Sequence, residues 1–186
     1  MKILMLGNSL TAANHMPVML AKLLDAEVTV HARGGARLAE QLNPNTKMGA
    51  RTAQVLHERN FDYVILQEMS HGPATATHRY LDSVRGLTKM IRETGAEPVI
   101  YGTWAFRPGC GKLQEIGMDA EEMHRQMQEA FRAAAEENDL RIANVGEAFR
   151  GKGFSGELYA PDGLHPSEEG SRLAAEVIAA ELKEKS

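Results

Sequence analysis

The sequence lacks the features of disulfide-bonded and membrane-spanning proteins. It contains a single cysteine, Cys110, so no disulfide can form within the chain. No apolar stretch reaches the ~18 residues that a membrane-spanning helix requires. The opening segment MKILMLGNSL has too short an apolar run for a signal peptide and lacks a small-residue cleavage site. We therefore expect a protein of a reducing compartment, located in the cytoplasm and without a membrane span.

The sequence also lacks any block of like charge. Its net charge is −4, with acidic and basic residues mixed along the chain. Without a basic block we expect no nucleic-acid partner, and without an acidic tail we expect no disordered extension. Apolar residues make up 43% of the chain and charged residues 25%, which is ordinary for a globular protein. These numbers leave the oligomeric state open.

Motifs for bound nucleotides and metals are missing as well. Neither GxxxxGK[ST] nor GxGxxG occurs, and the histidines show no HExxH or other ligand spacing. We therefore expect no cofactor and no metal site.

Apolar strand-like runs alternate with amphipathic segments along the whole chain. The length suits one domain over residues 1–186. We expect helices near 16–24, 48–59, 77–93, 119–138 and 167–184, because apolar residues recur there at helical spacing. The predicted strands are 2–6, 27–32, 62–66, 97–101 and 140–144. This alternation predicts a three-layer α/β/α fold with a flavodoxin-like, five-stranded parallel sheet in the order 2-1-3-4-5.

Polar clusters follow several of these strands, at the sheet edge where such folds bind ligands. Gly7-Asn8-Ser9-Leu10 comes directly after the first strand. A serine there is either a helix cap or a nucleophile, and a nucleophilic hydroxyl needs a base within hydrogen-bond reach.

The segment Asp162-Gly163-Leu164-His165-Pro166-Ser167 contains such a base at the entrance to the last helix. Because Asp162 and His165 are three positions apart on a turn, the carboxylate can meet one imidazole nitrogen while the other nitrogen faces outward as a general base. The alternative is a turn-capping Asp162 beside a surface histidine. Ser167 is expected to cap the final helix.

Together, GNSL and DGLHPS resemble the SGNH (GDSL-like) hydrolase superfamily, whose first block is usually GDSL and whose last is DxxH. The resemblance spans residues 7–167 and implies a serine esterase with Ser9 as nucleophile, His165 as base and Asp162 as the acid that orients it. Asn8 replaces the Asp of the first block, which is not a triad member.

The family's middle blocks supply oxyanion donors and match this sequence weakly. The second block falls at Arg33-Gly34-Gly35-Ala36, where either glycine can supply a backbone N–H, and we favour Gly35. The third block is normally GxND, but this chain reads LQEMS. We expect the Gln67 amide to replace the Asn, with Ser70 as the substitute, although Gln67 can equally satisfy buried backbone groups.

Other polar and aromatic side chains near these blocks have two interpretations. Trp104 follows the fourth strand and either walls the substrate pocket or belongs to the core. Arg33, Arg37 and Arg107 either bind an acidic substrate or form a solvated face, and His71 lies beside the predicted site.

The resulting hypothesis is hydrolysis of a small carboxylic ester through an acyl-enzyme. The rival hypotheses are a non-catalytic flavodoxin-like module that binds a phosphate at helix N-termini and a degenerate member of the superfamily.

Overall fold

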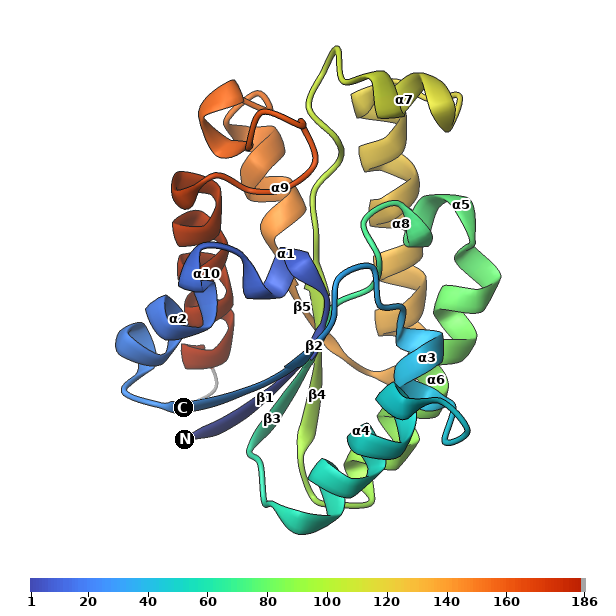
Figure 1. Ribbon diagram of the computed structural model, residues 1–186, viewed down its shortest axis with the longest axis vertical. Coiled ribbons are helices and arrows are strands. Elements are labelled where there is room, and N and C mark those ends of the chain that lie inside the picture. The colour runs from blue at the N-terminus through green and yellow to red at the C-terminus, as the bar shows by residue number, and fades with distance from the viewer. Residues whose placement is uncertain (185–186) are drawn as a thin grey trace.

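The computed structural model describes residues 1–184, which fold around a sheet of five parallel strands (Figure 1). The strands are β1 (Lys2–Gly7), β2 (Glu27–Ala32), β3 (Tyr63–Leu66), β4 (Glu97–Gly102) and β5 (Arg141–Asn144). They lie in the order β2-β1-β3-β4-β5, so the predicted order is confirmed. After its first residue β1 is buried throughout, as expected for a central parallel strand covered on both faces.

Helices cover both faces of the sheet, which confirms the predicted three layers (Figure 1). One layer holds α1 (Ser9–Ala12), α2 (Met16–Leu24), α9 (Val145–Gly151) and α10 (Glu168–Lys183). The other holds α3 (Leu38–Leu42), α4 (Lys47–Glu58), α5 (Gly72–Thr75), α6 (Thr77–Arg92) and α8 (Ala120–Asn138). The short helix α7 (Gly111–Glu115) and the 3₁₀ turns η1 (Ala13–His15) and η2 (Gly156–Leu158) belong to the connections.

The long helices begin where side chains cap them. Thr46 Oγ1 accepts the Gly49 N–H at 2.9 Å, and Asp119 Oδ1 accepts the Glu122 N–H at 2.8 Å. Ser167 caps α10 as expected, because its Oγ accepts the N–H of Gly170 at 3.1 Å.

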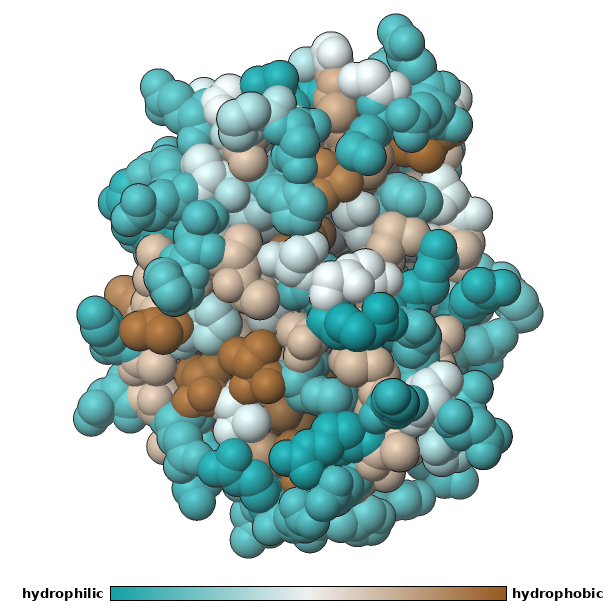
Figure 2. Space-filling view, viewed as in Figure 1, coloured by the Kyte–Doolittle hydropathy of each residue, from teal (hydrophilic) through white to brown (hydrophobic). Residues whose placement is uncertain are grey.

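Exposed large apolar side chains gather at one end of the sheet. Figure 2 shows apolar atoms over the region of α2 and the edge strand β2, whereas most of the remaining visible surface is hydrophilic. Within the described residues these side chains are Met1, Val18, Leu23 and Val30. None of the helices in residues 1–184 is both long enough and apolar enough to cross a membrane.

Candidate active site

The turn after β1 places Ser9 at the carboxyl edge of the sheet. Asn8 caps α1 by accepting the Leu10 N–H on its side-chain oxygen at 3.1 Å. The Asn8 carbonyl accepts the N–H groups of Thr11 and Ala12, both at 3.1 Å. Because the peptide is planar and trans, the N–H of Ser9 points away from that carbonyl, out of the start of the helix. The Ser9 N–H can therefore donate a hydrogen bond to a group bound at this edge of the sheet.

Gly7 is required for this turn because there is no space for a side chain. A Cβ at Gly7 would lie 2.5 Å from Thr11 Oγ1 and 2.6 Å from Gln67 Oε1. The glycine that opens the GNSL block therefore lets the middle block pack directly against the serine turn.

The loop before α10 brings His165 to Ser9. The imidazole Nε2 lies 2.9 Å from Ser9 Oγ, and Nδ1 lies 2.6 Å from Asp162 Oδ2. The second carboxylate oxygen, Asp162 Oδ1, accepts the backbone N–H groups of Leu164 and His165, both at 3.0 Å. The three side chains that the two end motifs nominated thus form one chain of hydrogen bonds.

Asp162 is held in its ionised form. Burial would raise the pKa of this carboxyl group, but hydrogen bonds from the His165 side chain and from the N–H groups of Leu164 and His165 outweigh it. The pKa of Asp162 is lowered to about 2. A carboxylate at this position fixes the orientation of the imidazole and favours a positive charge on it.

The loop after β4 is hydrogen-bonded to the loop that carries Asp162 and His165. Three consecutive carbonyls, those of Asp162, Gly163 and Leu164, each accept a hydrogen bond from it. The donors are Cys110 Sγ at 3.3 Å, the Arg107 N–H at 2.9 Å and Trp104 Nε1 at 3.1 Å, respectively. Trp104 is only 1% exposed and stacks on Phe149 at 4.2 Å between ring centroids. Trp104 therefore supports the His165 loop from the core. It is not among the residues that line the cavity beside Ser9, so the interpretation that it walls the substrate pocket does not fit the structure.

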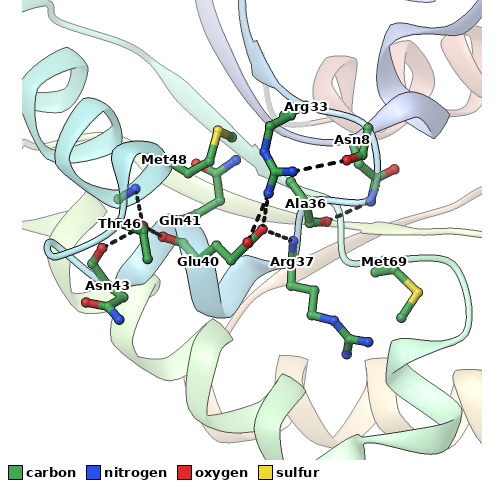
Figure 3. A network of polar contacts seen from close by, with 12 residues as sticks. Asn8, Arg33, Ala36, Arg37, Glu40, Gln41, Asn43, Thr46, Met48 and Met69 are labelled. Carbon is green, nitrogen blue, oxygen red and sulfur yellow. Dashed lines mark hydrogen bonds and ion pairs between the residues drawn. The ribbon is translucent and has the colours of Figure 1, made fainter.

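The loop after β2 is tied to the serine turn (Figure 3). Asn8 Nδ2 donates to the Ala36 carbonyl at 3.0 Å, and Arg33 forms an ion pair with Glu40 at 2.7 Å. Gly35 has φ of +69°, a conformation that favours glycine, and it lines the cavity beside Ser9. Gly34 is not among the residues that line it.

Gln67 and Ser70 occupy different environments at the end of β3. Gln67 is 1% exposed, and its Oε1 accepts the N–H of Asn8 and the hydroxyl of Thr11, both at 2.9 Å. Its amide nitrogen donates to the carbonyl of Glu68. Ser70 lines the cavity, and among residues 1–184 its hydroxyl has one hydrogen-bond partner, the Met69 sulfur at 3.7 Å. The expectation that Gln67 supplies the oxyanion donor does not fit these contacts, because its amide is already engaged away from the cavity.

The cavity at this edge is small, about 180 Å³. It is lined by Asn8, Ser9, Leu10, Gly35, Met69, Ser70, Leu164 and His165. Its apolar lining comes from Leu10, Met69 and Leu164. In the part of the chain that the structure describes, no group of three or more His, Cys, Asp or Glu side chains is arranged to hold a metal ion.

Glu68 is a buried carboxyl group that precedes Met69, one of the residues lining the cavity. It is 6% exposed, and its two oxygens accept the N–H groups of Met69 at 2.6 Å and Leu38 at 3.3 Å. Burial raises the pKa of Glu68, opposed by those two hydrogen bonds and by the charges of Arg37 and Arg79. Glu68 was not among the predicted site residues, although an acidic residue two positions after a buried strand is visible in the sequence.

Comparisons with known proteins agree with this architecture. The model of the GDSL-like lipase/acylhydrolase family matches residues 5–173. A candidate SGNH hydrolase from Slackia heliotrinireducens is 56% identical over 98% of each chain, with a TM-score of 0.94. The psychrotrophic esterase EstA from Pseudoalteromonas sp., in a structure inhibited by monoethylphosphonate, is 14% identical over 99% of this chain and 97% of its own, with a TM-score of 0.72. At that identity EstA shares the fold alone. No curated protein matches the chain.

Proposed function

Because the chain belongs to the GDSL-like lipase/acylhydrolase family, we propose that it hydrolyses short-acyl carboxylic esters with Ser9 as nucleophile. The observation that carries this proposal is the Ser9–His165–Asp162 chain of hydrogen bonds, at 2.9 Å and 2.6 Å, opening into a cavity. The cavity of about 180 Å³ favours a short acyl group over a long chain.

The reaction proceeds in two halves. His165 Nε2 takes the Ser9 proton as Ser9 Oγ attacks the ester carbonyl, and Asp162 stabilises the imidazolium that forms. The tetrahedral intermediate collapses, His165 returns the proton to the leaving alcohol, and an acyl-Ser9 remains. Water then attacks the acyl group with His165 as base, which releases the carboxylic acid and restores Ser9.

The oxyanion is stabilised by donors that face the cavity. The Ser9 and Gly35 N–H groups have no acceptor among residues 1–184, and both residues line the cavity. We assign the third donor to the Ser70 hydroxyl in place of Gln67. Such preorganised donors act on charge that develops in the transition state.

The proposal is tested with a fluorophosphonate probe and a panel of 4-nitrophenyl esters of rising acyl length. The wild-type protein is expected to bind the probe covalently at Ser9, located by mass spectrometry, and to hydrolyse the acetate faster than the octanoate. Ser9→Ala and His165→Ala should each lower kcat by ~10³-fold or more, and combining them should cost little further because the groups act as a unit.

His57→Ala is the matched control, since His57 is an exposed histidine on α4. It should retain the wild-type rate. A folded protein that neither reacts with the probe nor cleaves any ester is instead the non-catalytic binding module, and the proposal is then wrong.

A further inference from the structure

Two of the arginines that lack a salt bridge lie in loops that border the candidate active site. Most arginines form ion pairs within the described residues, such as Arg33 with Glu40 and Arg125 with Glu122. The arginines with no salt bridge in residues 1–184 are Arg37, Arg79, Arg92, Arg107 and Arg132. Arg37 and Arg107 lie in the loops after β2 and β4, which both contact the site. This is notable in a chain whose net charge is −4.

Arg107 lies against the loop that carries His165. Its N–H donates to the Gly163 carbonyl at 2.9 Å, and its Cβ would lie 3.5 Å from a Cβ built on Gly163. The Arg107 side chain is half-buried. Arg107 therefore borders the loop that carries His165, the residue that returns a proton to the leaving alcohol in the proposed reaction.

Arg37 lies on the opposite rim, after the Gly35 loop. Its side chain runs away from the Arg33–Glu40 pair, on the side of Met69, which lines the cavity (Figure 3). Beside Met69 and Ser70 lies His71, whose ring packs edge-on to Phe106 at 6.1 Å between centroids. Burial lowers the pKa of His71, and the charges of Arg37 and Lys112 lower it further, so both cations lie close enough to act on this ring.

The acidic groups of the same edge have other partners. Glu68 is buried and accepts two backbone N–H groups, Asp162 is bonded to His165, and Glu40 is paired with Arg33. Arg37 acts on Glu68 through its charge without forming an ion pair with it. Arg37 and Arg107, which border the site and are called the cationic rim below, therefore lack a carboxylate partner within 4.0 Å among the described residues.

We propose that Arg37 and Arg107 form a subsite for a negatively charged group on the alcohol portion of the ester. The inference rests on the proposed function and names its substrate class: short-acyl esters whose alcohol carries a carboxylate or a phosphate. The acyl group occupies the small cavity with apolar walls, and the anionic alcohol extends over the cationic rim. Guanidinium groups suit both anions because their planar N–H donors match carboxylate and phosphate oxygens.

The size of the effect follows from Coulomb's law. A unit charge about 4 Å away in a water-like environment is worth ~1 kcal/mol, or about a fivefold change in an equilibrium constant. Two such cations acting on one anion should therefore raise kcat/KM ~10-fold or more at low salt. The advantage should decrease as salt is added, since exposed charges are screened.

The test compares phenyl acetate with 4-acetoxybenzoate and 4-acetoxyphenyl phosphate, which separate carboxylate from phosphate. Because these alcohols differ in intrinsic reactivity, the quantity measured is the anionic-to-neutral ratio of kcat/KM in each variant relative to wild type. Arg37→Gln and Arg107→Gln should each lower that ratio about 3- to 10-fold. Arg37→Lys and Arg107→Lys should retain most of it, because the charge is conserved.

Arg132→Gln is the matched control, since Arg132 is an exposed arginine on α8 that also lacks a salt bridge. It should leave the ratio at the wild-type value. The inference is overturned if the Gln variants lower the rates for neutral and anionic esters alike, or if all ratios are insensitive to salt.

A second readout separates this inference from the proposed function. Binding of 4-hydroxybenzoate, compared with phenol, is measured by NMR titration on the Ser9→Ala protein, which needs no turnover. Preferential binding of the anion that is lost in Arg37→Gln and Arg107→Gln supports the subsite even if no ester is cleaved. Equal binding of the two phenols contradicts it.

Discussion

Gln67 shows how one buried amide can hold two functional segments together. It accepts the Asn8 N–H and the Thr11 hydroxyl, and it donates to the Glu68 carbonyl. The residue before the nucleophile and the middle block are thereby fixed relative to each other. The sequence placed Gln67 at the correct strand end but left the direction of its side chain open, because an amide both donates and accepts hydrogen bonds.

We predict that Gln67→Leu lowers stability more than it lowers the chemical rate. The change leaves the Asn8 N–H buried without an acceptor, which costs about 1–3 kcal/mol. The melting temperature should fall by several degrees, while kcat in the folded fraction falls less than tenfold. Thermal unfolding and active-site titration with a fluorophosphonate separate the two effects.

Ser70→Ala gives the converse result if the assignments are correct. It should keep the melting temperature near that of the wild type and lower kcat by ~10²-fold, the typical cost of losing one oxyanion donor. A large kcat loss in Gln67→Leu with no loss in Ser70→Ala would return the donor role to Gln67.

At the scale of elements, the segment between β4 and α8 acts as the support of the His165 loop. The predicted strand 97–101 and helix 119–138 leave a long connection between them, and the structure adds the short helix α7 within it. Helices α1, α3, α5, α7 and α9 were all missed, since helices of about one or two turns show no apolar periodicity and gain most of their stability from tertiary packing. The three hydrogen bonds from this segment to consecutive carbonyls could not be predicted either, because they join groups that are distant in the sequence.

Trp104→Phe tests that support. Phenylalanine can keep the stacking on Phe149 but lacks the N–H that holds the Leu164 carbonyl. We expect kcat to fall about 3- to 10-fold with little change in KM, as His165 samples orientations away from Ser9, and stability to fall by ~1 kcal/mol. Steady-state kinetics and thermal melts provide both values.

Cys110→Ala removes the weaker S–H bond to the Asp162 carbonyl and should have the smaller effect on kcat. If Trp104→Phe lowers stability but leaves kcat unchanged, this loop merely packs and does not orient the imidazole.

For the whole molecule, the fold was readable and the site was readable in part. The alternation of apolar strands and amphipathic helices restricts the fold to a doubly wound sheet, and the order of its strands was predicted. The motifs nominated Ser9, His165 and Asp162, which the structure brings together. The sequence alone left open the placement of the cationic side chains beside the site, the hydrogen bonds of Gln67 and the position of Trp104. Each of these depends on packing between segments that are distant in the sequence.

Two carboxyl groups at the site give the stability of the molecule opposite dependences on pH. The pKa of Asp162 is lowered to about 2, so its contribution is present above pH ~4 and is lost as the pH falls towards 2. Burial raises the pKa of Glu68 in the folded state above its usual value. The folded state therefore binds this proton more tightly than the unfolded state, and stability decreases as the pH rises from the usual pKa through the raised one. We therefore predict that stability contributed by this pair is greatest at mildly acidic pH.

Melting temperatures between pH 3 and pH 8 check this prediction. Relative to wild type, Glu68→Gln should gain stability as the pH rises above about 4.5, the usual pKa of the group. Asp162→Asn should lose its disadvantage below pH ~4, a difference of at most about 1 kcal/mol because the side chain is 43% exposed. Curves that stay parallel across this range would contradict both assignments.

Ser9 and His165 lie 156 positions apart in the sequence, which has a consequence for synthesis. Ser9 follows β1, the first of the five strands to be synthesised, whereas the imidazole that contacts it comes from the loop before α10. A growing chain therefore carries the serine without its base until that loop has been made, by which point all five strands have already been synthesised.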